Sequence, residues 1–191
     1  MKKLLITLCA TAVLSACGSM SPMSESKMSD TKTVMVGGAA MFPSKDIVDN
    51  AVNSKDHTTL VAAVKAAGLV DTLKSPGPFT VFAPVNAAFD ALPAGTVTTL
   101  LKPENKATLT KVLTYHVVPG RLSAADLSRQ ISNGNGRALL KTASGGTLVA
   151  SMSGSNIVIT DDGGNSTSVT IADVFQSNGV IHVVNMVLLP K

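Results

Sequence analysis

The segment Ser177–Pro190 reads S-N-G-V-I-H-V-V-N-M-V-L-L-P, and its apolar residues populate both faces of an extended chain. They are Val180, Ile181, Val183, Val184, Met186, Val187, Leu188 and Leu189. A strand that is apolar on both faces is usually a central strand, covered on each side. Asn178-Gly179 supplies a tight turn at its start, and Pro190 has no N–H to extend the ladder. The segment therefore predicts a domain built around its last strand.

The composition permits a core and excludes some partners. The chain has 191 residues, of which 45% are hydrophobic, so one domain can be stabilised by packing. Aromatic residues make up 3%, which argues against a base-stacking platform or an aromatic sugar-binding cleft. Removal of Lys2 and Lys3 with a signal peptide lowers the 16 basic residues to 14 against 12 acidic ones, and the net charge from +4 to +2. We therefore expect no nucleic-acid partner.

Residues 1–16 are predicted to be a signal peptide. Met1-Lys2-Lys3 is a basic start, and the apolar run from Leu4 to Leu14 is too short to span a bilayer. The run ends in Leu14-Ser15-Ala16-Cys17-Gly18, which resembles the lipobox of bacterial lipoproteins. The resemblance implies cleavage before Cys17 and acylation of that residue. The alternative is an ordinary signal peptide with a cysteine nearby.

Residues 17–36 are predicted to form a lipidated flexible tether, because they are rich in Ser, Met, Thr and Lys and show no periodicity. Loss of Cys9 and acylation of Cys17 leave no cysteine for a disulfide or a thiolate site. The tether methionines are more often incidental than a soft-metal site, so no metal is expected. Gly18 after the cysteine resembles the pattern for outer-membrane delivery in cells with two membranes. We thus expect the domain in the periplasm or on the cell surface, attached to the membrane through its lipid alone.

Residues 37–191 are predicted to be a single domain in which helices come first and hairpins later. The helix signals are Ser44 as a cap, a start near Thr58, Asn86 as a cap, Pro103-Glu104 as an opening, and the capping-box pair Ser123 and Asp126. The predicted strands are Phe79–Ala83, Arg137–Thr142, Thr147–Met152, Asn156–Thr160, Ser168–Ala172 and the last segment, and Val117–Gly120 is predicted to be a strand fragment and turn. This order of elements indicates the α+β class.

Three blocks in this order carry a resemblance to a known family. They are G-P-F-T-V-F-A-P-V-N-A-A-F (Gly77–Phe89), Y-H-V-V-P-G (Tyr115–Gly120) and the last segment, Ser177–Pro190. Together they resemble the fasciclin, or FAS1, domain, over roughly residues 44–190. The resemblance implies a seven-stranded β wedge with flanking helices, and adhesion or protein binding outside the cell without catalysis. Asn185 stands where the family often has an acid, which weakens any role that needs a carboxylate there.

The resemblance also suggests candidate partner-binding residues. In animal relatives an Asp-Ile pair before the last block and the Tyr-His motif are associated with integrin binding, and the matching positions here are Asp173, Val174, Tyr115 and His116. For each of these residues, a purely structural role within the fold is the alternative to partner binding. Asp173 can cap the turn around Val174-Phe175, Tyr115 can be a core residue, and His116, like His182, can form hydrogen bonds within the core.

The chain shows no recognised catalytic pattern. It contains no Gly-x-Ser-x-Gly elbow, no His-Glu-x-x-His and no phosphate-binding glycine loop. His57, His116 and His182 are too scattered to suggest a zinc set, and Asp161-Asp162 fits a Gly-rich turn better than a calcium loop. We expect no catalytic residue and no cofactor.

Two functions remain. The first is a lipid-anchored module that binds a surface protein or polysaccharide in adhesion. The alternative is a periplasmic carrier that holds a small apolar ligand between helices and sheet.

Overall fold

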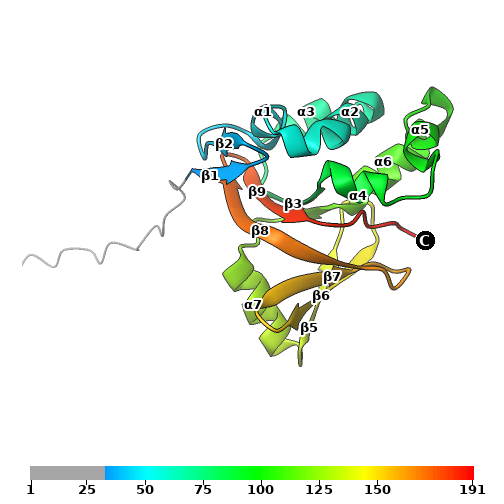
Figure 1. Cartoon of the computed structure of the whole chain (residues 1–191). Coiled ribbons are helices and arrows are strands. Elements are labelled where there is room, and N and C mark those ends of the chain that lie inside the picture. Colours follow the sequence, from blue (N-terminus) through cyan, green and yellow to red (C-terminus); the bar gives the residue numbers. More distant parts are fainter. Residues whose placement is uncertain (1–32) are drawn as a thin grey trace, which may run out of the picture.

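The computed structural model describes residues 33–191 (Figure 1). Helices and strands are mixed within one domain, as predicted for the α+β class. The predicted signal peptide, Cys17 and most of the predicted tether lie outside the described residues. No helix of the described part of the chain has the length and apolar character needed to cross a membrane.

Seven strands form the main sheet, as the wedge prediction requires, in the order β4-β3-β9-β8-β7-β6-β5. Their bounds are β3 Phe79–Pro84, β4 Val117–Pro119, β5 Arg137–Lys141, β6 Thr147–Ser153, β7 Asn156–Thr160, β8 Ser166–Gln176 and β9 Gly179–Val184. β3 and β9 run parallel and the other neighbours run antiparallel. The amide of Ala143, after β5, donates to the carbonyl of Val117 in β4 at 2.7 Å, so the two ends of the sheet approach each other.

The last strand is central, as predicted. β9 lies between β3 and β8, and all six of its residues are buried. It ends at Val184, however, earlier than the apolar run suggested. Met186 is 44% exposed because the chain has already left the ladder there, whereas Val187 and Leu188 are buried in the segment that follows.

The helices cover one side of the β3–β9–β8 part of the sheet. Their bounds are α1 Ile47–Ala51, α2 Thr58–Ala67, α3 Val70–Lys74, α4 Asn86–Asp90, α5 Thr96–Leu100 and α6 Lys106–Tyr115, with short 3-10 turns at Lys55–His57 and Pro103–Asn105. α7, Ala124–Asn133, packs against β5, β6 and β7 on another side (Figure 1). Ser123 and Asp126 form the predicted capping box of α7.

Two predicted caps are wrong. Asp46, not Ser44, caps α1, because its side chain accepts from the amide of Asp49. Asn86 does not cap its own helix, which has Val85 at the N-cap position. Its Oδ1 instead accepts from the amide of Thr59 at 3.0 Å, so it caps α2 from 27 residues away. Sequence spacing identified a capping residue type but not the helix it would cap.

A two-stranded hairpin, β1 Val34–Val36 and β2 Ala39–Met41, precedes α1. Val36 and Met41 are each 2% exposed and belong to the core. The predicted boundary between tether and domain at residue 37 is therefore wrong. The strand Val34–Val36 was missed because it is too short to show periodicity.

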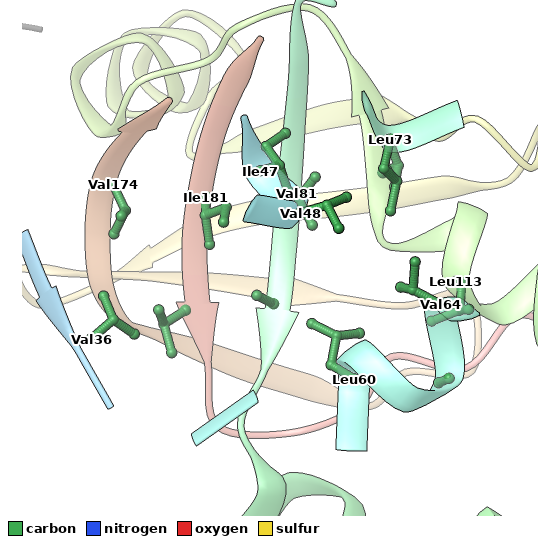
Figure 2. Close-up of a cluster of buried hydrophobic side chains, with 14 of the residues drawn as sticks. Val36, Ile47, Val48, Leu60, Val64, Leu73, Val81, Leu113, Val174 and Ile181 are labelled. Atoms are coloured by element: carbon green, nitrogen blue, oxygen red, sulfur yellow. The ribbon is translucent and has the colours of Figure 1, made fainter. Parts of the chain in front are cut away.

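Two main clusters of buried side chains lie on different parts of the sheet. One joins α1, α2, α3 and α6 to the inner side of β3, β8 and β9, where Figure 2 shows Val48, Leu60 and Val64 beside Val81 and Ile181. The other contains Leu127 and Ile131 of α7 with Leu148 and Ile159 of the sheet. The sheet thus requires apolar residues on both faces of β9, because Val183 belongs to the first cluster and Val184 to the second.

Candidate functional site

Tyr115, the last residue of α6, is fully buried. Its hydroxyl donates to the carbonyl of Thr147 and accepts from the amide of Asp162, both at 3.0 Å. Burial raises the pKa of the phenol to about 12. A Cβ on Gly146 would lie 2.5 Å from the tyrosine ring, so this turn must carry glycine. Tyr115 therefore joins α6 to two turns of the sheet.

His116 follows Tyr115 and is 3% exposed. Its Nε2 accepts from the amide of Leu188 at 3.0 Å, so the ring proton resides on Nδ1, which donates to the carbonyl of Val112 at 2.8 Å. Burial lowers the pKa of His116 to about 4. The neutral ring thus ties α6 to the segment after β9.

Asp173 and Val174 lie at an irregularity of β8 where the register with β9 shifts. Asp173 has a left-handed backbone with φ +58°, and its Oδ1 accepts from the amide of Ala124 at 2.7 Å. It caps α7, not the turn around Val174-Phe175 that the sequence suggested. Val174 is 1% exposed and packs in the helix-side cluster.

His182 of β9 supports the same region. Its Nε2 donates to the carbonyl of Leu122 at 2.8 Å, and its Nδ1 faces the amide of Asp173 at 3.4 Å. The ring stacks on Phe82 with centroids 5.7 Å apart, and burial lowers its pKa. His182 is therefore a core histidine with internal hydrogen bonds, which is the structural alternative given for it above.

The structure does not assemble the four candidate residues into one exposed site. The polar partners of Tyr115 lie at the ends of β6 and β7, whereas the partner of Asp173 begins α7. Three of the four candidates, Tyr115, His116 and Val174, are buried, and the fourth, Asp173, is half-buried. These positions favour the structural alternatives stated for them, and partner binding by them stays a prediction.

Asp161 is buried in the turn between β7 and β8. Its carboxylate accepts from the amides of Gly163, Asn165 and Leu189. Burial acts to raise the pKa of Asp161, but hydrogen bonds from these residues outweigh it and lower the pKa below its ordinary value. The described residues contain no group of three or more His, Cys, Asp or Glu side chains that could hold a metal ion. Asp161 holds the turn, and Asp162 in the same turn is exposed.

An apolar cavity of about 100 Å³ lies between the helices and the sheet. Val48, Leu60, Val64 and Leu113 border it from the helices, and Val81 and Ile181 border it from β3 and β9 (Figure 2). Lys65 and Thr72 also border it and are exposed, so the cavity reaches the surface beside α2 and α3. His57 also borders the cavity. No sequence pattern marks the cavity, because its lining residues come from elements spread along most of the described chain and read as ordinary core.

A second feature is the outer sheet face, which we define as the outward-pointing residues of β5 to β8. They are Arg137, Leu139, Lys141, Thr147, Val149, Ser151, Val158, Thr160, Ser166 and Ser168. Each is exposed or half-buried, while the alternate residues pack against α7. Leu139 is 72% exposed, the most of any large hydrophobic side chain in the described part of the chain. Alternation along Arg137–Lys141 could have identified this face from the sequence.

Comparison with known proteins agrees with this architecture. The family model of the fasciclin domain matches residues 55–190. The chain belongs to the fasciclin family. Protein sll1483 of Synechocystis sp. is 47% identical over 160 residues, covering 83% of this chain and 81% of that protein. The cell surface glycolipoprotein MPB83 of Mycobacterium bovis is 31% identical over 160 residues, covering 81% of this chain and 64% of that protein.

A solved fasciclin structure shows the same fold. The FAS1 domain pair from the insect cell adhesion molecule Fasciclin I superposes with a TM-score of 0.56 at 23% identity. The match covers 73% of this chain and 45% of the longer domain pair. The predicted fasciclin fold is confirmed.

Proposed function

We propose that this fasciclin-domain protein is lipid-anchored through Cys17 and binds a protein or polysaccharide at the cell envelope, outside the cytoplasm, in adhesion. It acts as a binding module and not as an enzyme. Support comes from its relatives, since MPB83 is named a cell surface glycolipoprotein and Fasciclin I a cell adhesion molecule.

The observation that carries this proposal is the outer sheet face. Leu139 projects between Arg137 and Lys141 on β5, and the described residues place no element over it. The rest of the face consists of Ser, Thr and Val side chains without an acid. An exposed apolar side chain beside two cations and many hydroxyls suits a partner that presents acidic and hydrogen-bonding groups.

The experiment is a comparison of attachment and aggregation in a deletion strain and in the same strain complemented with the full chain. The proposal expects the deletion to lower attachment and the complementing chain to restore it. Attachment and aggregation that do not change on deletion would overturn the proposal.

The apolar cavity favours a second candidate function, a periplasmic carrier for a small apolar ligand. The cavity lies between helices and sheet and is bordered almost entirely by apolar side chains. Protein interiors are usually close-packed, so an apolar cavity of this size provides space that a small apolar ligand can fill. Native mass spectrometry of protein purified from its own host tests this function. A stoichiometric small molecule supports it, and an empty protein contradicts it.

A further inference from the structure

β5 is the strand at one end of the main sheet, and its only strand partner among the described residues is β6. Thr142, the residue after β5, donates its amide to the carbonyl of Gly146 at 3.0 Å, so these two residues form a hydrogen-bonded pair. Hydrogen-bonded and non-bonded pairs alternate in an antiparallel ladder, so Ala138 and Leu140 direct their N–H and C=O groups to β6. The N–H and C=O of Leu139 therefore point away from β6, at the open edge of the sheet.

The neighbouring hairpin gives the same alternation. Ser153 and Asn156 flank the two-residue turn between β6 and β7, and such a turn closes on a hydrogen-bonded pair. Counting back by two along β6, Val149 also bonds to β7, so Leu148 bonds to the other neighbour, β5. Leu148 lies opposite Leu140, which confirms that Leu140 faces β6 and that the residue before it faces the edge.

The open part of this edge is short, because both of its ends are occupied. The amide of Arg137 donates to the carbonyl of Gly134 at 3.2 Å, and the amide of Ala143 donates to the carbonyl of Val117 at 2.7 Å. Between them, the amide and carbonyl of Leu139 have no hydrogen-bond partner among the described residues, and its side chain is 72% exposed. An unpaired strand edge is a template to which another extended segment can add.

The side chains beside Leu139 favour one kind of segment. Arg137 and Lys141 are exposed, and neither forms an ion pair with an acid of the described residues. A second copy of β5 is a poor occupant, because antiparallel pairing centred on Leu139 places Arg137 of one chain opposite Lys141 of the other. Charges on an edge strand protect against such self-pairing. A segment with acidic residues at these two positions meets both cations instead.

We propose that an extended segment of a protein partner adds to β5 as a further antiparallel strand, with acidic residues opposite Arg137 and Lys141 and an apolar residue opposite Leu139. This inference rests on the adhesion function proposed above and names its partner as an acidic protein segment. Two backbone hydrogen bonds at Leu139 give affinity, and the cross-strand pairs on the outer sheet face give specificity. Side chains two residues apart share a face, so the partner carries the pattern acid-x-apolar-x-acid.

The probe is a synthetic heptapeptide, blocked at both ends, in which glutamate, valine and glutamate alternate with threonine. The protein is the chain from residue 17 onward, with Cys17→Ser to keep it free of lipid. NMR titration and hydrogen exchange follow the backbone amides. We expect the amide of Leu139 to exchange fast in the free protein, and to shift and become protected when the peptide binds. The amide of Leu140, bonded to β6, should be protected throughout.

Two control peptides separate the backbone from the side chains. Methylation of the valine nitrogen removes the N–H that bonds to the carbonyl of Leu139 and blocks close approach, so binding should be lost. Lysine in place of both glutamates should weaken binding at least about fivefold, because two like-charge pairs replace two opposite-charge pairs. The double variant Arg137→Glu with Lys141→Glu should reverse this preference.

Two variants of Leu139 test the edge from the side of the protein. Leu139→Pro removes the N–H at the edge and no ladder hydrogen bond, because this N–H does not face β6. It should abolish binding of the peptide. Leu139→Ala keeps the N–H and should bind the peptide more weakly than the unmodified chain. The methylated peptide tests the same hydrogen-bonded contact with unmodified protein, and so decides the question even where Leu139→Pro fails to fold.

The outcomes separate this inference from the adhesion function. A Leu139 amide that is protected in the free protein or does not shift with the peptide would overturn strand addition, as would equal binding of the methylated peptide. Shifts along β5 with an alginate oligosaccharide but not with the peptide would overturn it in favour of a polysaccharide. In each case adhesion stands if the deletion strain attaches poorly. Unchanged attachment of the deletion strain would overturn the adhesion function itself.

Discussion

The backbone amide of Leu188 donates to Nε2 of His116 at 3.0 Å, across 72 residues of sequence. The contact attaches the segment after the central strand to the end of α6. It also fixes the ring as neutral, because an accepting Nε2 cannot carry a proton. The Tyr-His motif of this fasciclin domain thus holds two distant parts of the chain together.

This contact predicts a loss of stability in acid. The pKa of His116 lies at about 4 in the folded protein against an ordinary value of 6.5. The unfolded chain therefore binds an extra proton between these values, and the free energy of unfolding falls as the pH drops from about 6.5 to 4. The loss is about 3 kcal/mol for this group. Urea denaturation at several pH values measures it.

His116→Gln provides the comparison, because it removes the titrating ring. Its stability should be lower at neutral pH by about 1–3 kcal/mol, since the Leu188 amide loses its acceptor or gains a poorer one. Its stability should also fall less steeply below pH 6.5. Equal pH slopes in the two proteins would show that the ring does not have a depressed pKa.

Asp173 offers a test that separates folding from binding. Asp173→Ala removes the acceptor of the Ala124 amide, while the capping box of Ser123 and Asp126 remains, and it places alanine at φ +58°, so we expect a loss of about 1–3 kcal/mol in unfolding free energy. Asp173→Asn keeps an oxygen acceptor and tolerates the left-handed backbone, so it should cost less than about 1 kcal/mol. If Asp173 acts only as a cap, each variant should lower the attachment of cells only as far as it lowers the stability of the protein. Attachment lost in a stable Asp173→Asn protein would instead assign it to partner binding.

The outer sheet face predicts variants that bind poorly but fold well. Leu139→Ser combined with Arg137→Glu and Lys141→Glu should leave the free energy of unfolding within about 0.5 kcal/mol per site, because the side chains are exposed. Attachment of cells carrying this variant should fall toward the level of the deletion strain. Val52→Ser, on an exposed apolar residue after α1, is the matched control and should attach normally. Equal attachment of the two variants would exclude this face.

The predicted lipid anchor is tested by exchanging one cysteine at a time. Cys17→Ser should remove the acyl groups from the mature protein and release it from the membrane fraction. Cys9→Ser, inside the predicted signal peptide, should leave lipidation and fractionation unchanged. Mass spectrometry of the mature N-terminus and membrane fractionation report both results. A Cys17→Ser protein that stays with the membrane would refute the anchor.

Much of the fold could be predicted because its signals are local. The two-faced apolar run of Gly179–Val184, the capping box of Ser123 and Asp126, and the alternation of β5 to β7 depend on neighbouring residues alone. Predictions failed where an element was too short, as in β1, or where a capping residue acted on another helix, as Asn86 does on α2. A local sequence pattern indicates which interaction a residue can make, but it does not identify the distant segment with which the residue makes it.

The sequence by itself determined the class of fold, the central position of the last strand and the family, because hydrophobic periodicity and the order of motifs depend only on the order of the residues. Only the tertiary structure decided that Asp173 caps α7, that His116 holds Leu188, and that an apolar cavity lies between the helices and the sheet. These features arise where distant segments meet, and the distance and direction of such contacts depend on the packing of all the elements between them.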